Sequence, residues 1–402
     1  MAVTVRDVKC IVTAPGMCDI AVVKVETSEP GLYGLGCATF TQRITAVKAA
    51  VEDYLRPLMI GRDVSKIEDA WQQMMGNSYW RNGPVLNNAI SGVDEALGDI
   101  KGKMLGAPVY DLVGGKAREG VAVMPRGAHG RTLEELGDSV EAMMKDGFGF
   151  IRVGMFSPDD CPDERKPEGA PAGVYINPKK TIERYVEVFR YLRERFGNEP
   201  DLGVDVHERL NPTEAVTLAK ALEPYHPCFL EDLLQPENVE WFRQVRNTTT
   251  VPMAMGELFV NPMEYKDLIS NRLIDYIRCH ISMIGGFTPA RKLAAFCEVF
   301  GVGTMWHGPH DITPVGMAAQ LHLDLVSPNC ICQEFVIPNE LTYEMFPGAP
   351  VVRRGYAYCN DRPGWGVDFD EELAKKYPAK GYNMRGGLAF LGRRLDGTAV
   401  RS

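Results

Sequence analysis

Residues 202–257 read LGVDVHERLNPTEAVTLAKALEPYHPCFLEDLLQPENVEWFRQVRNTTTVPMAMGE. The stretch holds three short apolar runs, and each ends in a carboxylate: Asp205, Glu231 and Glu257. Segments with helical spacing of apolar residues separate the runs. A short apolar run followed by an amphipathic helix is the repeating unit of parallel α/β folds. The sequence therefore places the three acids at the carboxyl ends of three successive strands.

The same alternation of apolar run and amphipathic helix extends from about residue 121 to about residue 335. Several helical segments begin with a capping residue and a proline, as in Asn211-Pro212 and Thr288-Pro289. Eight runs fit a closed (β/α)₈ barrel better than an open sheet. The runs are Val121–Met124, Gly149–Val153, Leu202–Val206, Cys228–Glu231, Pro252–Gly256, Ile274–Arg278, Val302–Trp306 and Ile331–Phe335.

The segments on either side of the barrel predict a two-domain chain. Residues 3–12 and 19–27 alternate like strands of an antiparallel hairpin or meander, with Gly31, Gly34 and Gly36 as punctuation. Helical spacing then covers 44–60, 64–76 and 84–105. We predict an α/β fold: a (β/α)₈ TIM-like barrel over 121–335 with an N-terminal α+β capping domain over 1–120. Residues 336–402 are expected to pack back onto the capping domain, and 154–178 to form a lid or rim.

Composition excludes several classes of protein. The 402 residues are 45% hydrophobic and 24% charged, which is ordinary for a globular chain and excludes collagen-like, coiled-coil and disordered proteins. The formal net charge of −9 argues against nucleic acid as a partner. The N-terminus lacks a signal-peptide pattern and no long apolar stretch occurs, so we expect a cytoplasmic protein without a membrane partner. The ten cysteines contain no CxxC pair and are expected to be buried thiols.

Asp205, Glu231 and Glu257 follow one another at equal spacing, about one βα unit apart. On a barrel this register brings the three carboxylates together at the carboxyl-terminal rim. Like charges at close quarters repel unless a cation neutralises them, and oxygen ligands suit a hard ion such as Mg²⁺. The three acids are therefore the predicted metal ligands. Asp232 should point to the opposite face, because side chains alternate along a strand.

The residues near these acids suggest a chemistry. His207 lies two positions beyond Asp205, so on a strand it would stand beside the metal. Arg278 closes the sixth run and could pair with a substrate carboxylate or with Glu257. Mg²⁺ can stabilise the enediolate formed when a proton is removed next to a carboxylate, while a histidine serves as acid or base. If the adjacent carbon carries a hydroxyl, the reaction is a dehydration.

The motifs resemble those of a known superfamily. The layout and GVDEALGDIKGKMLGAPVYDLVGGKAR at 92–118 are similar to the enolase superfamily. The segments VDVHERLNP, FLEDLLQPEN, GELFVNP, IDYIRCHISMIGG and MWHGPHDITPVGMAAQLHLDL resemble its mannonate dehydratase subgroup, which includes starvation-sensing proteins. The resemblance implies one Mg²⁺, an acid-sugar substrate such as D-mannonate or D-gluconate, a 2-keto-3-deoxy product, and a homo-oligomer.

Carried over residue by residue, the resemblance assigns roles to matching positions. It makes His207 the acid that protonates the departing hydroxyl, and Arg152 one half of the proton-abstracting pair. It gives substrate contact or support of the site to four further residues: Arg278, His307, Asp311 and Glu334. It agrees with the spacing argument in making Asp205, Glu231 and Glu257 the Mg²⁺ ligands.

The chain departs from the subgroup pattern at several positions. The tyrosine expected after Arg152 has no clear counterpart, and Tyr175 is the one tyrosine of that loop. Gly154 stands where a glutamine is usual, and Met124-Pro125-Arg126 where a histidine is frequent. These departures leave open an alternative: a metal-binding relative that senses or binds a small acid with little turnover. A racemase or cycloisomerase is disfavoured, because residues 150–154 contain no lysine.

Overall fold

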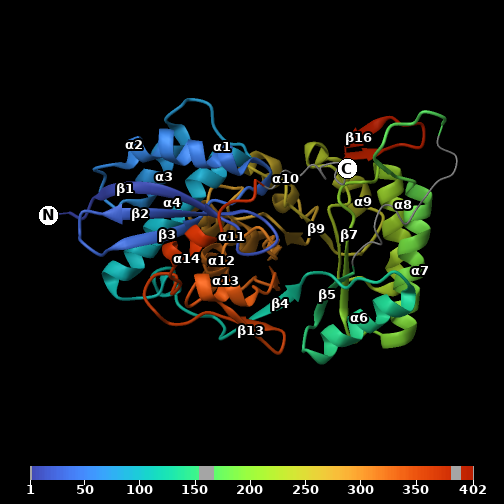
Figure 1. Cartoon of the computed structure of the whole chain (residues 1–402). Helices are drawn as coiled ribbons and strands as arrows, with labels where there is room; N and C mark the ends of the chain where they lie inside the picture. Colours follow the sequence, from blue (N-terminus) through green and yellow to red (C-terminus); the bar gives the residue numbers. More distant parts are fainter. Residues whose placement is uncertain (1, 154–166, 382–390, 402) are drawn as a thin grey trace. The chain divides into compact units, whose positions relative to one another are not determined.

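The structure, a computed structural model, describes residues 2–153, 167–381 and 391–401. The chain divides into two compact units (Figure 1). The first comprises residues 1–123, 257–262 and 278–382, and the second comprises 124–256, 263–277 and 383–402. The predicted domain boundaries after residues 120 and 335 stay a prediction. Of the predicted lid at 154–178, the part from 154 to 166 lies outside the described residues.

The first unit begins with an antiparallel meander. Strand β1 (Val5–Thr13) pairs with β2 (Ile20–Thr27), and β2 pairs with β3 (Tyr33–Cys37), as the sequence predicts. Helices from the following segment pack on this sheet and form one hydrophobic core with it (Figure 1). They are α1 (Ile44–Ala49), a π-helical turn (Ala50–Leu55), α2 (Arg56–Met59), α3 (Ile67–Gly76), α4 (Pro84–Leu105) and α5 (Val109–Leu112).

Helix α4 approaches β3 more closely than side chains would permit. A Cβ atom on Gly34 would lie 2.0 Å from the Ala96 carbonyl oxygen, and one on Gly36 would lie 2.1 Å from the Gly92 carbonyl oxygen. The interpretation of Gly34 and Gly36 as punctuation between elements is therefore wrong. Both lie inside β3, where the missing side chain lets helix and strand backbones meet.

Three buried carboxylates of α4 hold the surrounding segments by their backbone. Glu95 accepts a hydrogen bond from the Cys37 N–H at 2.7 Å, and Asp94 accepts one from the Thr288 N–H at 2.8 Å. Asp99 accepts from a backbone N–H of β3 at 3.0 Å and from one of the C-terminal segment at 2.9 Å. These bonds satisfy backbone groups that would otherwise be buried without a partner.

The rest of the first unit comes from the later part of the chain. Residues 336–381 contact the meander, where the Ala14 N–H donates to the Tyr377 carbonyl at 2.9 Å. Strands β12, β4, β14 and β13 form one sheet in that order. The elements are β4 (Val121–Pro125), α11 (Phe287–Phe300), β11 (Gly303–Thr304), α12 (Pro314–Val326), β12 (Gln333–Phe335), α13 (Glu340–Met345), β13 (Val351–Arg353), β14 (Tyr356–Tyr358) and α14 (Glu371–Lys376).

The second unit is built on a parallel sheet with the strand order β10-β9-β8-β7-β5. Helices α6 to α9 accompany these strands (Figure 1). The strands are β5 (Phe150–Val153), β7 (Asp201–Asp205), β8 (Phe229–Glu231), β9 (Met253–Met255) and β10 (Tyr276–Ile277), and a smaller sheet holds β6 (Val174–Tyr175), β15 (Leu391–Arg393) and β16 (Ala399–Arg401). The helices are α6 (Leu133–Lys145), α7 (Pro178–Phe196), α8 (Pro212–Leu222), α9 (Trp241–Arg246) and α10 (Pro262–Ser270), with short 3₁₀ turns at Glu223–Tyr225 and Pro236–Asn238.

Each of the eight predicted runs overlaps one strand of the series β4 to β12. The short strand β6 lies in a loop and corresponds to none of the runs. Six of the eight strands are shorter than their runs, whereas β7 is as long as its run and β4 is one residue longer. Strands β13 and β14 were not predicted, because three residues are too few to show an alternating pattern.

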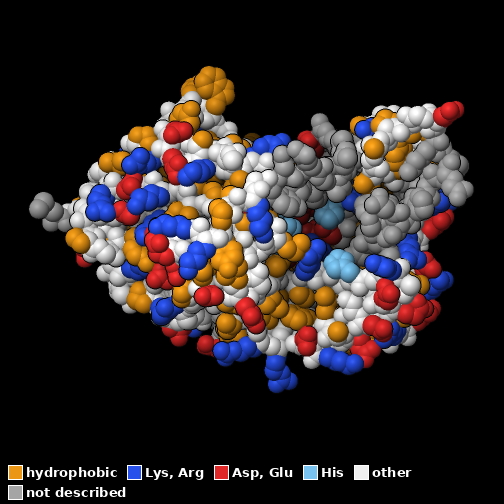
Figure 2. Space-filling model, viewed as in Figure 1, with side chains coloured by type: hydrophobic (Ala, Val, Ile, Leu, Met, Phe, Trp, Pro, Cys, Tyr) orange, Lys and Arg blue, Asp and Glu red, His pale blue; other side chains and the backbone are white. Residues whose placement is uncertain are grey.

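Two further findings concern the surface and the helices of the described residues. Figure 2 shows Lys and Arg interspersed with Asp and Glu on the visible face of the first unit, so this face has no continuous basic area of the kind that binds nucleic acid. Within the described ranges, no helix combines the length and apolar character needed to cross a membrane. The cytoplasmic location stays a prediction.

The buried acids of α4 predict a pH-dependent stability. Burial raises the pKa of Glu95 to about 8, above its value in an unfolded chain. The folded state then binds a proton that the unfolded state has lost, so this contribution is full at low pH and disappears as pH rises through the folded pKa. Between about pH 5 and about pH 9, wild type should lose about 4 kcal/mol more unfolding free energy than Glu95→Gln.

Urea denaturation at a series of pH values measures this difference. Glu29→Gln, at an exposed position, is the matched control and should follow wild type. Parallel stability curves for wild type and Glu95→Gln would show that Glu95 does not take up the proton.

Candidate active site

Two of the predicted metal ligands stand side by side in the second unit. Asp205 ends β7 and Glu231 ends β8, and the two residues are direct partners in the parallel pairing of these strands. Asp205 is 6% exposed and Glu231 is fully buried. Two carboxylates that are buried in register need nearby positive charge, because neither can be solvated as an ion.

Asp232 joins this pair. The prediction that it points to the opposite face is wrong, since carboxylate oxygens of Asp205, Glu231 and Asp232 lie within 4.8 Å of one another. Strand β8 ends at Glu231, and Asp232 has a left-handed backbone with φ 44°. Strand alternation no longer applies to a residue in that conformation. The three acids could hold a metal ion.

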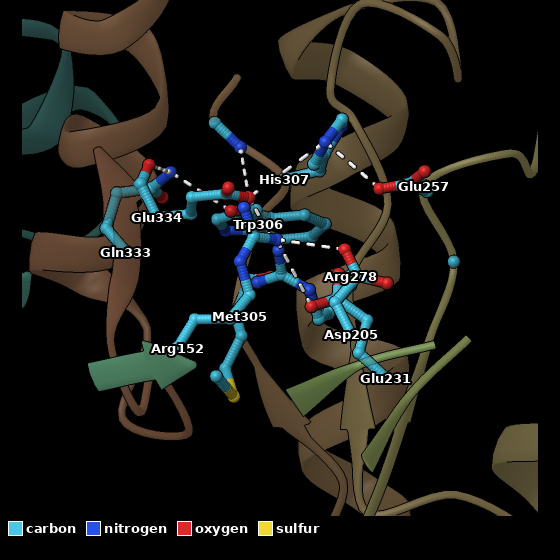
Figure 3. A network of polar contacts seen from close by, with 12 residues as sticks. Arg152, Asp205, Glu231, Glu257, Arg278, Met305, Trp306, His307, Gln333 and Glu334 are labelled. Carbon is cyan, nitrogen blue, oxygen red and sulfur yellow. Dashed lines mark hydrogen bonds and ion pairs between the residues drawn. The ribbon is translucent and has the colours of Figure 1, made fainter. Parts of the chain in front are cut away.

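Arg152 supplies positive charge to the acid pair. It lies on β5, and its Nη1 is 3.3 Å from Asp205 Oδ2 and 3.4 Å from Glu231 Oε2 (Figure 3). The side chain is 17% exposed, so these contacts are partly shielded from water. These contacts hold the Arg152 guanidinium against the two carboxylates at the strand ends.

His207 contacts Asp205, as expected, but for a different reason. It lies beyond the end of β7 with φ 51°, so the expected strand geometry does not place it. Instead the His207 N–H donates to Asp205 Oδ1 at 3.1 Å, and His207 Nε2 lies 3.0 Å from Asp205 Oδ2. The imidazole side chain is 37% exposed and can therefore reach a ligand at the strand ends.

Tyr175 lies in β6, where its hydroxyl donates to the Pro171 carbonyl at 2.7 Å. This contact favours a packing role over proton abstraction. Another tyrosine, Tyr185 of α7, was not singled out from the sequence. Its buried hydroxyl donates to the Asp205 carbonyl at 3.1 Å and fixes the end of β7. Its place on an amphipathic helix gave no signal of this contact.

The first unit holds the remaining predicted site residues. Arg278 and Glu334 form a buried ion pair at 2.5 Å, with side chains 0% and 3% exposed (Figure 3). Arg278 was predicted to pair with a substrate carboxylate or with Glu257, and its contact with Glu334 is an additional one that the sequence did not predict. The Glu334 carboxylate also accepts from the Gly308 N–H at 3.2 Å. A Cβ on Gly308 would lie 1.8 Å from the Glu334 carbonyl oxygen, so glycine is required there.

His307 connects two of the predicted site acids. Its Nε2 lies 3.1 Å from Glu257 Oε2 and 4.0 Å from Glu334 Oε2 (Figure 3). The edge of the buried His280 ring packs against it, with ring centroids 5.5 Å apart. The contact with Glu257 and the packing of His280 orient the His307 ring.

Asp311 is 8% exposed and accepts a hydrogen bond from the Thr41 hydroxyl at 2.8 Å. Thr41 follows β3 in the N-terminal part of the chain. The contact ties a predicted substrate-contact residue to the N-terminal part of the chain.

Two glutamines support the His307 segment and were missed from the sequence. Gln320 Nε2 donates to the His307 carbonyl at 2.9 Å, and Gln333 Nε2 donates to the Trp306 carbonyl at 3.1 Å. The two side chains also bond to each other at 3.1 Å. Both side chains are at least 98% buried. The sequence offered a signal for Gln320, which is a polar residue among mostly apolar positions of 315–325.

Comparison with protein families covers most of the chain. Residues 2–114 match the family described as Mandelate racemase / muconate lactonizing enzyme, N-terminal domain. Residues 135–373 match the family described as Enolase C-terminal domain-like.

Similar proteins cover the whole chain. A D-galactonate dehydratase family member of Enterocloster bolteae is 52% identical over 404 residues, 99% of both chains. One of Musicola paradisiaca is 48% identical over 415 residues, again 99% of both. The crystal structure of an enolase from Pantoea ananatis, with bound D-gluconate and Mg, superposes with a TM-score of 0.95 at 48% identity and covers 100% of both chains.

The buried Arg278–Glu334 pair yields a stability prediction. Glu334→Gln leaves the Arg278 guanidinium buried without its counter-charge, and this should cost about 3–5 kcal/mol of unfolding free energy. Chemical denaturation measures the loss. Glu372→Gln, which breaks the exposed Lys375–Glu372 pair, is the control and should change stability little. Equal effects of the two substitutions would contradict the burial argument.

Proposed function

This chain belongs to the enolase superfamily, in its D-galactonate dehydratase family, and from that membership we propose that it dehydrates an aldonic acid such as D-mannonate or D-gluconate in a Mg²⁺-dependent reaction. The prediction of the superfamily and of the α/β fold with an N-terminal capping domain is confirmed. The family makes the protein a hydro-lyase. The relatives' names do not include mannonate, so that substrate stays a prediction.

One observation carries the proposal. Asp205 and Glu231 are buried and in register at the ends of paired strands. Arg152 contacts both carboxylates, and His207 contacts Asp205. Such a set joins anionic ligands for a hard cation to two groups that can hold a proton or an anion. The relative from Pantoea ananatis, which binds D-gluconate and Mg, supports the same chemistry here.

The donor chemistry of the site fits Mg²⁺. Asp205, Glu231 and Asp232 offer hard oxygen atoms and no sulfur or nitrogen. Asp205, Glu231 and Glu257 remain the proposed ligands, and Glu257 comes two residues after the end of β9. Asp232 supports the set from beside Glu231. When bound, Mg²⁺ would lower the energy of the negative charge that develops on the substrate carboxylate.

The chain's own residues would perform the remaining steps. His207 holds a proton at the imidazole, next to Asp205, and would transfer it to the departing hydroxyl. Arg152 remains the proposed partner in proton abstraction, and as a guanidinium between two carboxylates it would orient the substrate acid. Arg278, His307, Asp311 and Glu334 are the proposed substrate contacts, with Arg278 acting through its hold on Glu334.

A second function is a binding or sensing role with little turnover. It is favoured by the Tyr175 hydroxyl, which donates to a backbone carbonyl. The homo-oligomer and the absence of nucleic-acid and membrane partners stay predictions. A panel of acid sugars with Mg²⁺, assayed for 2-keto-3-deoxy products, separates the two functions. Turnover of one acid at ordinary enzyme rates supports the dehydratase, and thermal stabilisation by an acid without turnover supports the sensor.

His207→Asn should remove at least about a hundredfold of the dehydration rate and leave Mg²⁺ bound, because only the proton donor is lost. Product assay and isothermal titration calorimetry measure the two quantities. His226→Asn is the control: His226 is exposed, also has a left-handed backbone, and accepts asparagine equally well. A full rate in His207→Asn would refute the acid role.

Glu231→Gln should weaken Mg²⁺ binding by at least about tenfold, since a neutral amide replaces a buried carboxylate ligand. Calorimetry with Mg²⁺ alone measures it. Glu240→Gln, at an exposed acid of the same unit, should bind as wild type does. Unchanged affinity in Glu231→Gln would exclude Glu231 as a ligand.

A further inference from the structure

Two arginines and a histidine lie near one another at the ends of β4 and β5 in the second unit. Arg126 directly follows β4, His129 lies three positions further on, and Arg152 lies in β5. The Ala128 N–H donates to the Arg152 carbonyl at 2.8 Å, and Ala128 forms a parallel bridge with Val153. This backbone pairing holds the segment 126–129 alongside the end of β5. We call Arg126, His129 and Arg152 the strand-end cationic cluster.

The cluster is crowded with like charge. Burial lowers the pKa of His129, and the positive charges of Arg126 and Arg152 lower it further. Within the part of the chain that the structure describes, no carboxylate offsets the two arginines at His129. Among the described residues, this cluster is therefore an exception to the acidic balance of the chain, whose formal net charge is −9.

The two arginines differ in their surroundings. Arg152 is mostly buried and contacts Asp205 and Glu231. Arg126 is exposed, and among the described residues no carboxylate pairs with it. Arg152 is thus neutralised by carboxylates beside the proposed reacting centre, whereas Arg126 is open to solvent. Arg126 lies at a strand end, where ligands of barrel proteins enter.

We propose that Arg126, assisted by His129, binds a second anionic group at the far end of an acid-sugar substrate. The substrate class is then a dianion, either an aldaric acid with a second carboxylate or an aldonic acid with a terminal phosphate. The planar guanidinium fork of Arg126 can bind either anion through two N–H donors. This inference rests on the proposed acid-sugar function, and it specifies further that the substrate carries two negative charges.

Binding to the Mg²⁺-loaded full-length protein tests the proposal without requiring turnover. D-glucarate and D-gluconate differ at one end, where a carboxylate replaces a hydroxymethyl group, and 6-phospho-D-gluconate provides the phosphate. Calorimetry should show at least one dianion binding about tenfold more tightly than D-gluconate. In Arg126→Gln this preference should fall to about twofold or less. The tighter of the two dianions identifies the anionic group.

Arg131→Gln is the matched control, because Arg131 is also exposed and lies on the same segment but outside the cluster. It should keep the wild-type preference, and Arg126→Lys should keep part of it, since the charge remains. Equal affinity of wild type for D-gluconate and both dianions would overturn the proposal, as would a preference that survives in Arg126→Gln. Turnover of D-gluconate without any preference for a dianion would refute this inference alone. A preference dependent on Arg126 without turnover of any acid would refute the dehydratase alone.

Discussion

The second unit depends on one electrostatic constraint: two carboxylates, Asp205 and Glu231, are buried side by side at the ends of paired strands. Parallel pairing fixes their separation, so they cannot move apart to relieve repulsion. Positive charge must come to them. Arg152 provides it from the next strand, and the donor chemistry of the acids suits a divalent cation equally well. The fixed Asp205 carboxylate also contacts the His207 imidazole and thereby orients it.

The first unit meets a related problem by pairing charges inside the protein. Arg278 and Glu334 are both buried, and each makes further bonds to the backbone around His307. A buried pair of this kind contributes little net stability, but losing one partner is costly. The pair therefore fixes where the segment 305–308 lies. Gln320 and Gln333 hold the same segment through its carbonyl groups, so His307 sits on a backbone fixed from both sides.

The sequence predicted the strands and the acids for a physical reason. Short apolar runs between capped amphipathic helices are typical of buried parallel strands. An acid that directly follows such a run is therefore expected at the carboxyl end of the strand. What failed was geometry beyond the strand ends. Asp232 and His207 adopt left-handed backbones, so the alternation that holds inside a strand no longer places them. The Arg278–Glu334 pair joins residues far apart in the chain, and no local pattern records such a contact.

Three departures of this chain from the subgroup pattern follow the first two predicted barrel strands. Arg126, Gly154 and the missing tyrosine all belong to the segments after the first two barrel strands, whereas the acids after the next three strands keep the family pattern. In the proposed mechanism the metal is held by those acids, and the part of the substrate beyond the reacting carbons would contact the first two strand ends. A change in the charge of that region alters which acid binds without altering what is done to it. Among the described residues no carboxylate pairs with the exposed guanidinium of Arg126, and this agrees with the proposed second anionic group of the substrate.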